Sequence, residues 1–230
     1  MIARLHFIVE GQTEEAFVVQ VLIPHLWSRS VYGVVGGVET SRKLGKKQSG
    51  GITRYVQAKK HICNWMSEDQ NRNAFFTTMF DLYALPTDFP NYGQARKQSD
   101  PYQRVKMLED ALSRDVGNRR LIPYIQLHEF EALLLAEPQK LDWQFINHEK
   151  AIGNLVQMVS EFDSPEMIDD DEETAPSKRI IQEIPEYKGR KESAGPLVAA
   201  KIGLDTLRSK CPHFNEWLNK IERLGEGASA

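Results

Sequence analysis

Apolar and polar positions along the chain alternate between short β-rich runs and longer stretches with helical periodicity. The first run, 3–9, is apolar and short enough for a buried strand, and it is followed by a helical pattern over about 13–28. Later strands and helices repeat this order. The further strands are expected at about 31–39, 75–80 and 121–126, and the further helices at about 53–69 and 101–115.

Strands that alternate with helices predict an α/β fold with a mainly parallel sheet and crossover helices. We expect a Rossmann-like sheet of about four strands flanked by helices. Beyond residue 127 the pattern is helical, with no further strand. The predicted division is an α/β domain over 1–140 and a helical C-terminal extension over 141–230 that packs on it. The acidic run 169–173 is expected to be a solvated loop.

The first predicted strand ends in an acid, a glycine and a helix-start signal. Glu10 would lie at the carboxyl end of the strand, which is the edge where α/β sheets bind ligands. Thr13 is a candidate cap for the next helix. Glu14 would then lie one helical turn away and face the same space. Two carboxylates that converge there are costly to keep ionised unless a cation lies between them.

Two later strands also end in acids, and parallel strands bring their carboxyl ends to one edge. Asp81 ends the strand at 75–80, and His128, Glu129 and Glu131 follow the strand at 121–126. Oxygen-rich clusters of this kind suit Mg²⁺ or Mn²⁺, whereas zinc would call for more histidine or cysteine. Glu129 and Glu131 remain alternatives for the later ligand, because one of them can instead complement a helix N-terminus.

Composition excludes several classes of protein. The 230 residues include 29 Lys and Arg against 32 Asp and Glu, so a net charge of −3 argues against a non-specific nucleic-acid coat. Cys63 and Cys211 have no ligand-spaced partners, which favours a reducing, cytoplasmic setting. No apolar stretch is long enough to span a bilayer, and no signal peptide is recognised at the N-terminus. The phosphate-binding loop of nucleotide hydrolases is also missing from the sequence.

Three motifs contain the acids that follow the strands: Val-Glu-Gly-Gln-Thr-Glu at 9–14, Phe-Asp-Leu-Tyr at 80–83 and His-Glu-Phe-Glu-Ala-Leu-Leu at 128–134. These motifs resemble the Toprim domain, the metal-binding catalytic module of topoisomerases, bacterial primases and the "overcoming lysogenization defect" (OLD) nucleases. The chain is similar in particular to uncharacterised bacterial Toprim-like proteins over nearly its whole length, and to the Toprim core over roughly 1–140.

The resemblance implies roles for individual residues. Glu10 would match the Toprim glutamate that serves as a metal ligand or general acid/base, and Glu14 the second acid of the nuclease branch. Asp81 would match the first aspartate of the Asp-x-Asp metal motif, and Glu129 or Glu131 the later metal-ligand acid. The chain departs from the family at Tyr83, which replaces the second aspartate and puts a second metal, and turnover itself, in question.

Two basic segments are candidates to neutralise phosphate charge. The first follows the second strand, and the second opens a late helix. The resemblance implies a lysine of the second segment near the metals, with Lys188 and Lys191 as alternatives. The predicted nucleic-acid contacts are Arg42, Lys43, Lys46, Lys47 and Arg190.

Together these features predict a divalent-metal-dependent nuclease that hydrolyses DNA or RNA. The resemblance implies a separately encoded ATPase of the ABC or AAA type as a partner, in a bacterial defence-like system. The main alternative is a non-catalytic Toprim-like subunit that binds nucleic acid or regulates such an ATPase. A primase-like nucleotidyl transferase is a third class.

Overall fold

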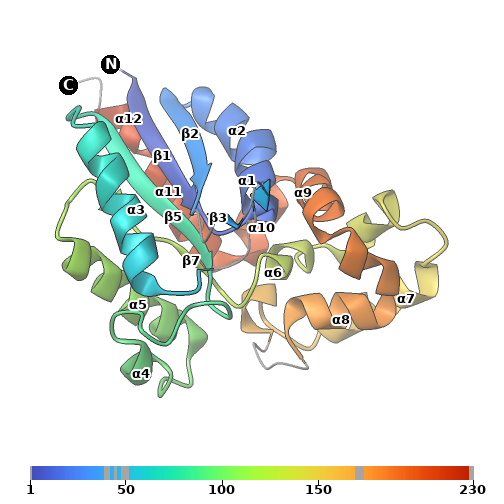
Figure 1. Cartoon of the computed structure of the whole chain (residues 1–230). Coiled ribbons are helices and arrows are strands. Elements are labelled where there is room, and N and C mark those ends of the chain that lie inside the picture. The colour runs from blue at the N-terminus through green and yellow to red at the C-terminus, as the bar shows by residue number, and fades with distance from the viewer. Residues whose placement is uncertain (1, 39–41, 44–45, 48–51, 169–173, 228–230) are drawn as a thin grey trace.

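A five-stranded parallel sheet forms the centre of the molecule (Figure 1). In the computed structural model, the described residues are 2–38, 42–43, 46–47, 52–168 and 174–227. The strand order is β2-β1-β5-β6, with β7 also beside β5. The strands are β1 (Ala3–Val9), β2 (Val31–Gly37), β5 (Ala74–Asp81), β6 (Leu121–Ile122) and β7 (Ile125–Gln126). The predicted parallel α/β fold is therefore confirmed.

Helices cover both faces of the sheet. A continuous helical stretch of α1, η1 and α2 packs with α11 on one face, while α3 and α5 cover the other (Figure 1). These elements are α1 (Gln12–Phe17), the π-helical η1 (Val18–Leu22), α2 (Ile23–Trp27), α3 (Tyr55–Glu68), α5 (Pro101–Val116) and α11 (Pro212–Glu222).

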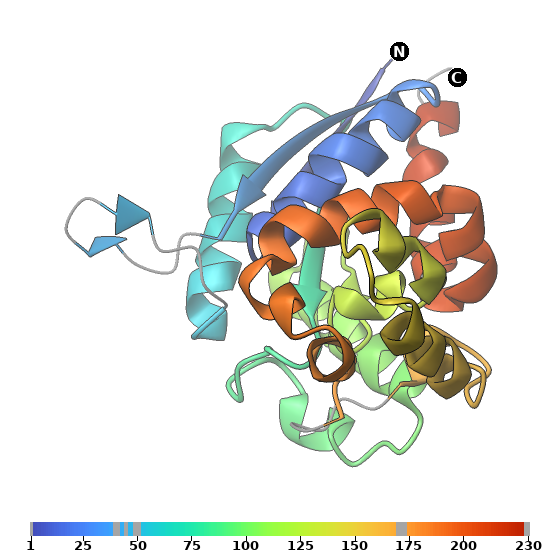
Figure 2. The same ribbon diagram turned by 90° about the vertical axis from the view of Figure 1, so that its right-hand side faces the viewer.

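The remaining elements are short or lie beyond the sheet. The strands β3 (Arg42–Lys43) and β4 (Lys46–Lys47) form an antiparallel pair apart from the main sheet (Figure 2). The other helical segments are α4 (Tyr92–Ala95), α6 (Glu131–Leu134), η2 (Pro138–Trp143), α7 (Glu149–Val159), η3 (Pro165–Met167), α8 (Pro176–Glu183), η4 (Pro185–Gly189), α9 (Lys191–Ile202), α10 (Leu204–Lys210) and α12 (Leu224–Gly227).

Alternation along β1 supplies both hydrophobic cores. Leu5, Phe7 and Val9 point into the core shared with α1, α2 and α11, and Ile8 points into the core shared with α3 and α5. All four side chains are fully buried. Because successive side chains of a strand alternate between faces, an apolar run with so few polar positions is what a strand covered on both sides requires.

The fourth predicted strand is divided by Pro123 into β6 and β7. Proline has no backbone N–H to donate to the ladder. Around Pro123, threonine hydroxyls of β5 form hydrogen bonds with the backbone in place of ladder hydrogen bonds. The hydroxyl of Thr77 donates to the carbonyl of Ile122 (2.6 Å), and that of Thr78 donates to the carbonyl of Tyr124 (2.8 Å) and accepts from its backbone N–H (2.9 Å).

The C-terminal helices share a core with the sheet. Trp217 of α11 stacks on Tyr124, with the ring centroids 4.1 Å apart, and its indole N–H donates to the hydroxyl of Thr77 (2.8 Å). The ring of Phe7 meets the same indole edge-on. The division at residue 140 stays a prediction, but the hydrophobic core runs across it.

This packing predicts that α11 is required for the stability of the whole chain. The variant Trp217→Ala should lose about 3–5 kcal/mol of unfolding free energy, because it leaves a cavity and removes a buried hydrogen bond. Urea unfolding followed by far-UV circular dichroism measures this loss. Trp143→Ala is the control, since 59% of Trp143 is exposed, and it should change stability far less. Equal effects of the two substitutions would contradict the shared core.

Candidate functional site

β1 and β5 are neighbours in the sheet, but the chain leaves their carboxyl ends in opposite directions. β1 leads through α1 and α2 to β2 on one side, and the chain returns past α3 to β5 on the other side of β1. In open parallel sheets, the crevice at such a switch point is the usual place for ligand binding. Glu10 follows β1 and Asp81 ends β5, so both acids stand at this crevice.

The Glu10 carboxylate joins the two strands. Its Oε2 accepts a hydrogen bond from the backbone N–H of Asp81 at 3.0 Å. Burial raises the pKa of Glu10 to about 7, although hydrogen bonds from the backbones of Asp81 and Ile52 act to lower it. The carboxyl group therefore exchanges its proton near neutral pH.

The start of α1 differs from the prediction at Thr13. The helix begins at Gln12 with Gly11 as its N-cap, and no side chain caps it in the way predicted for Thr13. Glu14 is the third helical residue, from which a glutamate reaches back toward the N-cap backbone. Hydrogen bonds from the backbones of Glu14 and Gly11 act to lower the pKa of Glu14, but burial and then the charge of Glu10 raise it to about 8.

Asp81 is the least compensated acid at the edge. Its Oδ1 is shielded from solvent and has no hydrogen-bond partner among the described residues. Burial, followed by the charges of Glu14 and Glu10, raises the pKa of Asp81 well above its usual range. A buried carboxylate oxygen without a donor is costly, because it has lost its water and gained nothing in exchange.

Glu129 and Glu131 face the same cavity and are held by the C-terminal helices. Glu129 Oε2 accepts from the backbone N–H of Ser177 (3.2 Å) at the start of α8, and burial, then the charge of Glu131, raises the pKa of Glu129. Glu131 Oε1 accepts from the hydroxyl of Tyr187 (3.1 Å) and lies 3.2 Å from Lys191 Nζ. Both predicted alternatives are therefore at the site.

A left-handed residue aims this segment into the cavity. His128 has φ of 61°, in the left-handed region that few residues other than glycine adopt, although asparagine, aspartate and histidine are found there more often than the rest. Its Nε2 lies 2.8 Å from the carbonyl oxygen of Glu166, and its own carbonyl accepts from the N–H of Tyr83 at 2.9 Å. The Glu166 carboxylate accepts from the backbone N–H groups of His213 and Phe214, so α11 supports the arrangement.

The acids line a cavity of about 320 Å³ that also contains basic and aromatic groups. Lys191 and Lys178 supply the positive charge, and Tyr83 supplies an exposed aromatic ring. Besides these, the lining includes Thr13, Glu14, Asp81, Glu129, Phe130, Glu131 and Ser177.

Not all predicted basic residues reach this cavity. Lys188 is exposed and is not part of the lining, and Arg190 donates to the backbone and side-chain oxygens of Gln144 on the neighbouring surface. For the basic segment after β2, the backbone is described only at β3 and β4. The side chains of Arg42, Lys43, Lys46 and Lys47 lie outside the described part of the structure, as does the acidic run 169–173.

Sequence reasoning did not single out Ser177, Lys178 or Tyr187. Pro176 is a recognisable helix start. However, no local sequence signal predicts that the N–H of Ser177 at this helix N-terminus donates to Glu129, which lies 48 residues earlier. Tyr187 directly precedes Lys188 in the second basic segment and has no local signal of its own. Its buried hydroxyl matters through its contact with Glu131, which is a tertiary contact.

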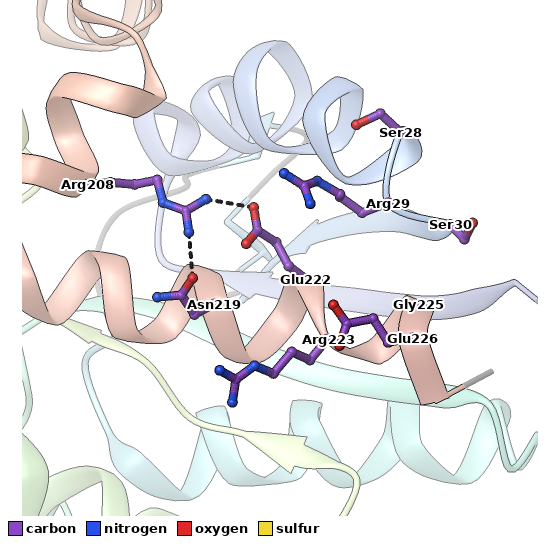
Figure 3. Close-up of a pocket in the computed structure, with 9 residues that line it drawn as sticks. All are labelled: Ser28, Arg29, Ser30, Arg208, Asn219, Glu222, Arg223, Gly225 and Glu226. Carbon is purple, nitrogen blue, oxygen red and sulfur yellow. Dashed lines mark hydrogen bonds and ion pairs between the residues drawn. The ribbon is translucent and has the colours of Figure 1, made fainter. Parts of the chain in front are cut away.

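A larger cavity of about 540 Å³ lies beside the amino-terminal end of β2, away from the carboxyl edge of the sheet (Figure 3). It is lined by residues of the turn before β2, including Arg29, and by residues of α10, α11 and α12. Its central groups already satisfy one another: Arg208 pairs with Glu222 (2.8 Å) and also donates to Asn219. Glu222 further contacts the His25 ring, so this acid, unlike Asp81, is paired with basic groups.

Three of the carboxylates, those of Glu10, Glu129 and Glu131, accept hydrogen bonds from protein groups. Within the described ranges, no group of three or more His, Cys, Asp or Glu side chains is arranged to hold a metal ion. The donors are the backbone of Asp81 for Glu10, the backbone of Ser177 for Glu129, and Tyr187 with Lys191 for Glu131. Cation binding would require these side chains to rotate toward the uncompensated oxygen of Asp81.

Fold and site together define an α/β protein with a buried carboxylate cluster at the switch point of its sheet. The chain belongs to the family described as a domain of unknown function (DUF4276), whose model matches residues 9–222. No curated protein and no solved structure matched the chain. The family match includes every acid of the cluster together with the C-terminal helices that contact it. None of the helices in the described ranges is long and apolar enough to cross a membrane.

The raised pKa values predict how stability depends on pH without divalent cations. A carboxyl group whose pKa is raised in the folded state keeps a proton that the unfolded chain has released. Folding stability should therefore fall as the pH rises from about 4.5 through the values near 7 for Glu10 and 8 for Glu14. Glu14→Gln should reduce this loss by on the order of 2 kcal/mol, as measured by urea unfolding between pH 5 and 8.5.

Glu15→Gln provides the matched control, because Glu15 is the neighbouring acid but is exposed. This variant should keep the wild-type pH dependence. If Glu14→Gln and Glu15→Gln gave the same curve, Glu14 would not be a buried, raised-pKa group.

The left-handed backbone at His128 yields a separate prediction. Unfolding free energy should decrease in the order His128→Asn, His128→Ala, His128→Val. All three substitutions remove the imidazole contact with the carbonyl of Glu166, but asparagine tolerates positive φ best, alanine tolerates it less well, and valine adds β-branched strain. We expect about 2 kcal/mol or more between the first and last variants in thermal or urea unfolding. Equal stability of the asparagine and valine variants would show that this backbone is not retained.

Proposed function

We propose that this protein is a divalent-metal-dependent phosphodiesterase that acts on nucleic acid. The observation that carries the proposal is the gathering of Glu10, Glu14, Asp81, Glu129 and Glu131 at the switch point of a parallel sheet. The charges of neighbouring acids raise the pKa of Glu14, Asp81 and Glu129, and protein interiors tolerate such clusters poorly without a cation. The cost of keeping them together favours a functional role over a structural one.

The residues present fit a hard cation. The donor set consists of carboxylate oxygens, which suits Mg²⁺ or Mn²⁺, and the unpartnered Oδ1 of Asp81 is a ligand atom that the protein leaves unused. Glu10, Asp81 and one of Glu129 and Glu131 would hold the ion. When bound, such an ion polarises a phosphoryl oxygen and lowers the pKa of a water molecule.

Other side chains of the cavity would transfer the proton and neutralise the charge of the phosphate. Glu14 lines the same cavity, and a bound ion would lower its pKa from about 8, so that its carboxylate could accept a proton from the attacking water or hold a second ion. Lys191 and Lys178 line the same cavity and would neutralise charge on the phosphate. Lys191 lies 3.2 Å from Glu131, so the lysine is already fixed beside the acids.

The resemblance to Toprim nucleases of the OLD type agrees with this assignment and suggests a separately encoded ABC or AAA-type ATPase as partner. The alternative is a Toprim-like subunit that binds nucleic acid or regulates such an ATPase without cleaving. Tyr83 favours this alternative, because it stands where the Toprim motif has its second aspartate. Mn²⁺-dependent nicking by the purified chain favours the enzyme. Metal-independent, ATPase-dependent binding without cleavage favours the alternative.

Removing a proposed ligand should abolish cleavage without unfolding the chain. Glu10→Gln and Asp81→Asn should each lower the rate by at least ~100-fold in Mn²⁺, because they remove the charge that holds the ion and keep the side-chain shape. Cleavage of labelled DNA and RNA oligonucleotides measures the rate, and circular dichroism checks the fold.

Glu15→Gln again serves as the control and should cleave like the wild type. Wild-type turnover that persists in a chelating buffer would overturn the metal mechanism. So would unchanged rates in either Glu10→Gln or Asp81→Asn.

A further inference from the structure

Tyr83 is an exposed aromatic residue on the rim of the acidic cavity. It lines this cavity with 44% of its surface exposed. Its side chain makes no hydrogen bond or ring contact with any described residue. Single exposed aromatics are common on protein surfaces, so exposure alone has no meaning. What distinguishes Tyr83 is its position two residues after Asp81, beside the proposed reacting centre.

The backbone below this ring is held firmly. The N–H of Tyr83 donates to the carbonyl of His128 (2.9 Å), and the N–H of Ala84 donates to the carbonyl of Asp81 (3.2 Å). The first bond joins the Tyr83 segment to the segment that carries Glu129, and the second closes a turn that begins at Asp81. The aromatic ring is therefore presented from a fixed position with respect to Asp81 and Glu129.

We propose that Tyr83 is a stacking platform for an unpaired nucleobase, so that the site accepts single-stranded nucleic acid. The inference rests on the proposed function for its chemistry and adds the substrate class to it. Base–aromatic stacking tolerates any base, because every base has a π-face. An aromatic ring beside phosphate-binding cations is the combination that single-strand binding sites use.

The charges around Tyr83 suit a strand that passes over the cavity. Lys178 and Lys191 line the same cavity, Lys178 with an exposed side chain. Both can contact backbone phosphates while a base stacks on the ring. The acids lie deeper, since Glu14 and Glu131 are only 6% and 5% exposed.

Recessed acids favour a single strand over a duplex. A phosphodiester must enter a cavity of about 320 Å³ to reach them, and a flexible strand can turn one phosphate inward. In a duplex the adjacent base is paired and stacked, and extruding it costs a few kcal/mol before it can reach Tyr83. The unpaired strand meets neither obstacle.

Fluorescence anisotropy with matched oligonucleotides tests the inference. The full chain in Ca²⁺ is titrated with a labelled single strand, as DNA and as RNA, and with the corresponding duplexes. Tyr83→Leu should weaken binding of at least one single strand by roughly 5- to 100-fold, the size expected for one lost stack, and Tyr83→Phe should bind like the wild type. Duplex binding should hardly change. Comparison of the DNA and RNA arms identifies which strand is the ligand.

Tyr32→Leu is the matched control, because Tyr32 is an exposed tyrosine (49%) on β2, outside the cavity lining. It should leave binding unchanged. Wild-type affinity of Tyr83→Leu for single strands, an equal loss for strand and duplex, a loss in Tyr83→Phe, or no single-strand binding by the wild type would each overturn the inference.

The two proposals fail separately. If the wild type binds single strands through Tyr83 but never cleaves them in Mn²⁺, the proposed hydrolysis is wrong and the stacking role stands. If the wild type cleaves in Mn²⁺ and Tyr83→Leu cleaves and binds single strands equally well, hydrolysis stands and the stacking role is wrong.

Discussion

The hydrogen bond from the backbone N–H of Asp81 to the Glu10 carboxylate, 3.0 Å long, ties the two central strands together where their connections diverge. It holds the buried Glu10 carboxylate beside the backbone of Asp81, near enough for the charge of Glu10 to act on the Asp81 carboxyl group. Burial raises the pKa of Glu10, and burial together with the charges of neighbouring acids raises the pKa of Glu14 and Asp81. Neighbouring groups offset part of the cost of burying these acids through hydrogen bonds and an ion pair.

Most of those groups come from the C-terminal half of the chain. Ser177 donates to Glu129, while Tyr187 and Lys191 satisfy Glu131. Trp217, further along, stacks on Tyr124 beneath the broken strand β6–β7. The helices beyond residue 140 are therefore part of both the hydrophobic core and the site, which agrees with a family match over 9–222.

The sequence predicted well what depends on short-range patterns. The boundaries of β1 and β5 and the parallel order of the sheet follow from apolar runs that alternate with helices, and the acids at the strand ends follow from the same pattern. What it missed depends on tertiary contacts. The cap at Thr13 was wrong, because Gly11 is the N-cap and Glu14 is the residue placed to reach back toward it. Lys191 could not be preferred over Lys188 from the sequence, because the preference rests on the tertiary contact between Lys191 and Glu131.

The central claim is that the carboxylate cluster is built for a divalent cation. Anomalous diffraction from crystals soaked in Mn²⁺ tests it most directly. The account predicts an anomalous peak between Glu10 and Asp81, with Asp81 Oδ1 as a ligand and at least one neighbouring glutamate turned away from its protein donor. Well-diffracting crystals that show no peak at millimolar Mn²⁺, with every carboxylate still on its protein donor, would contradict it.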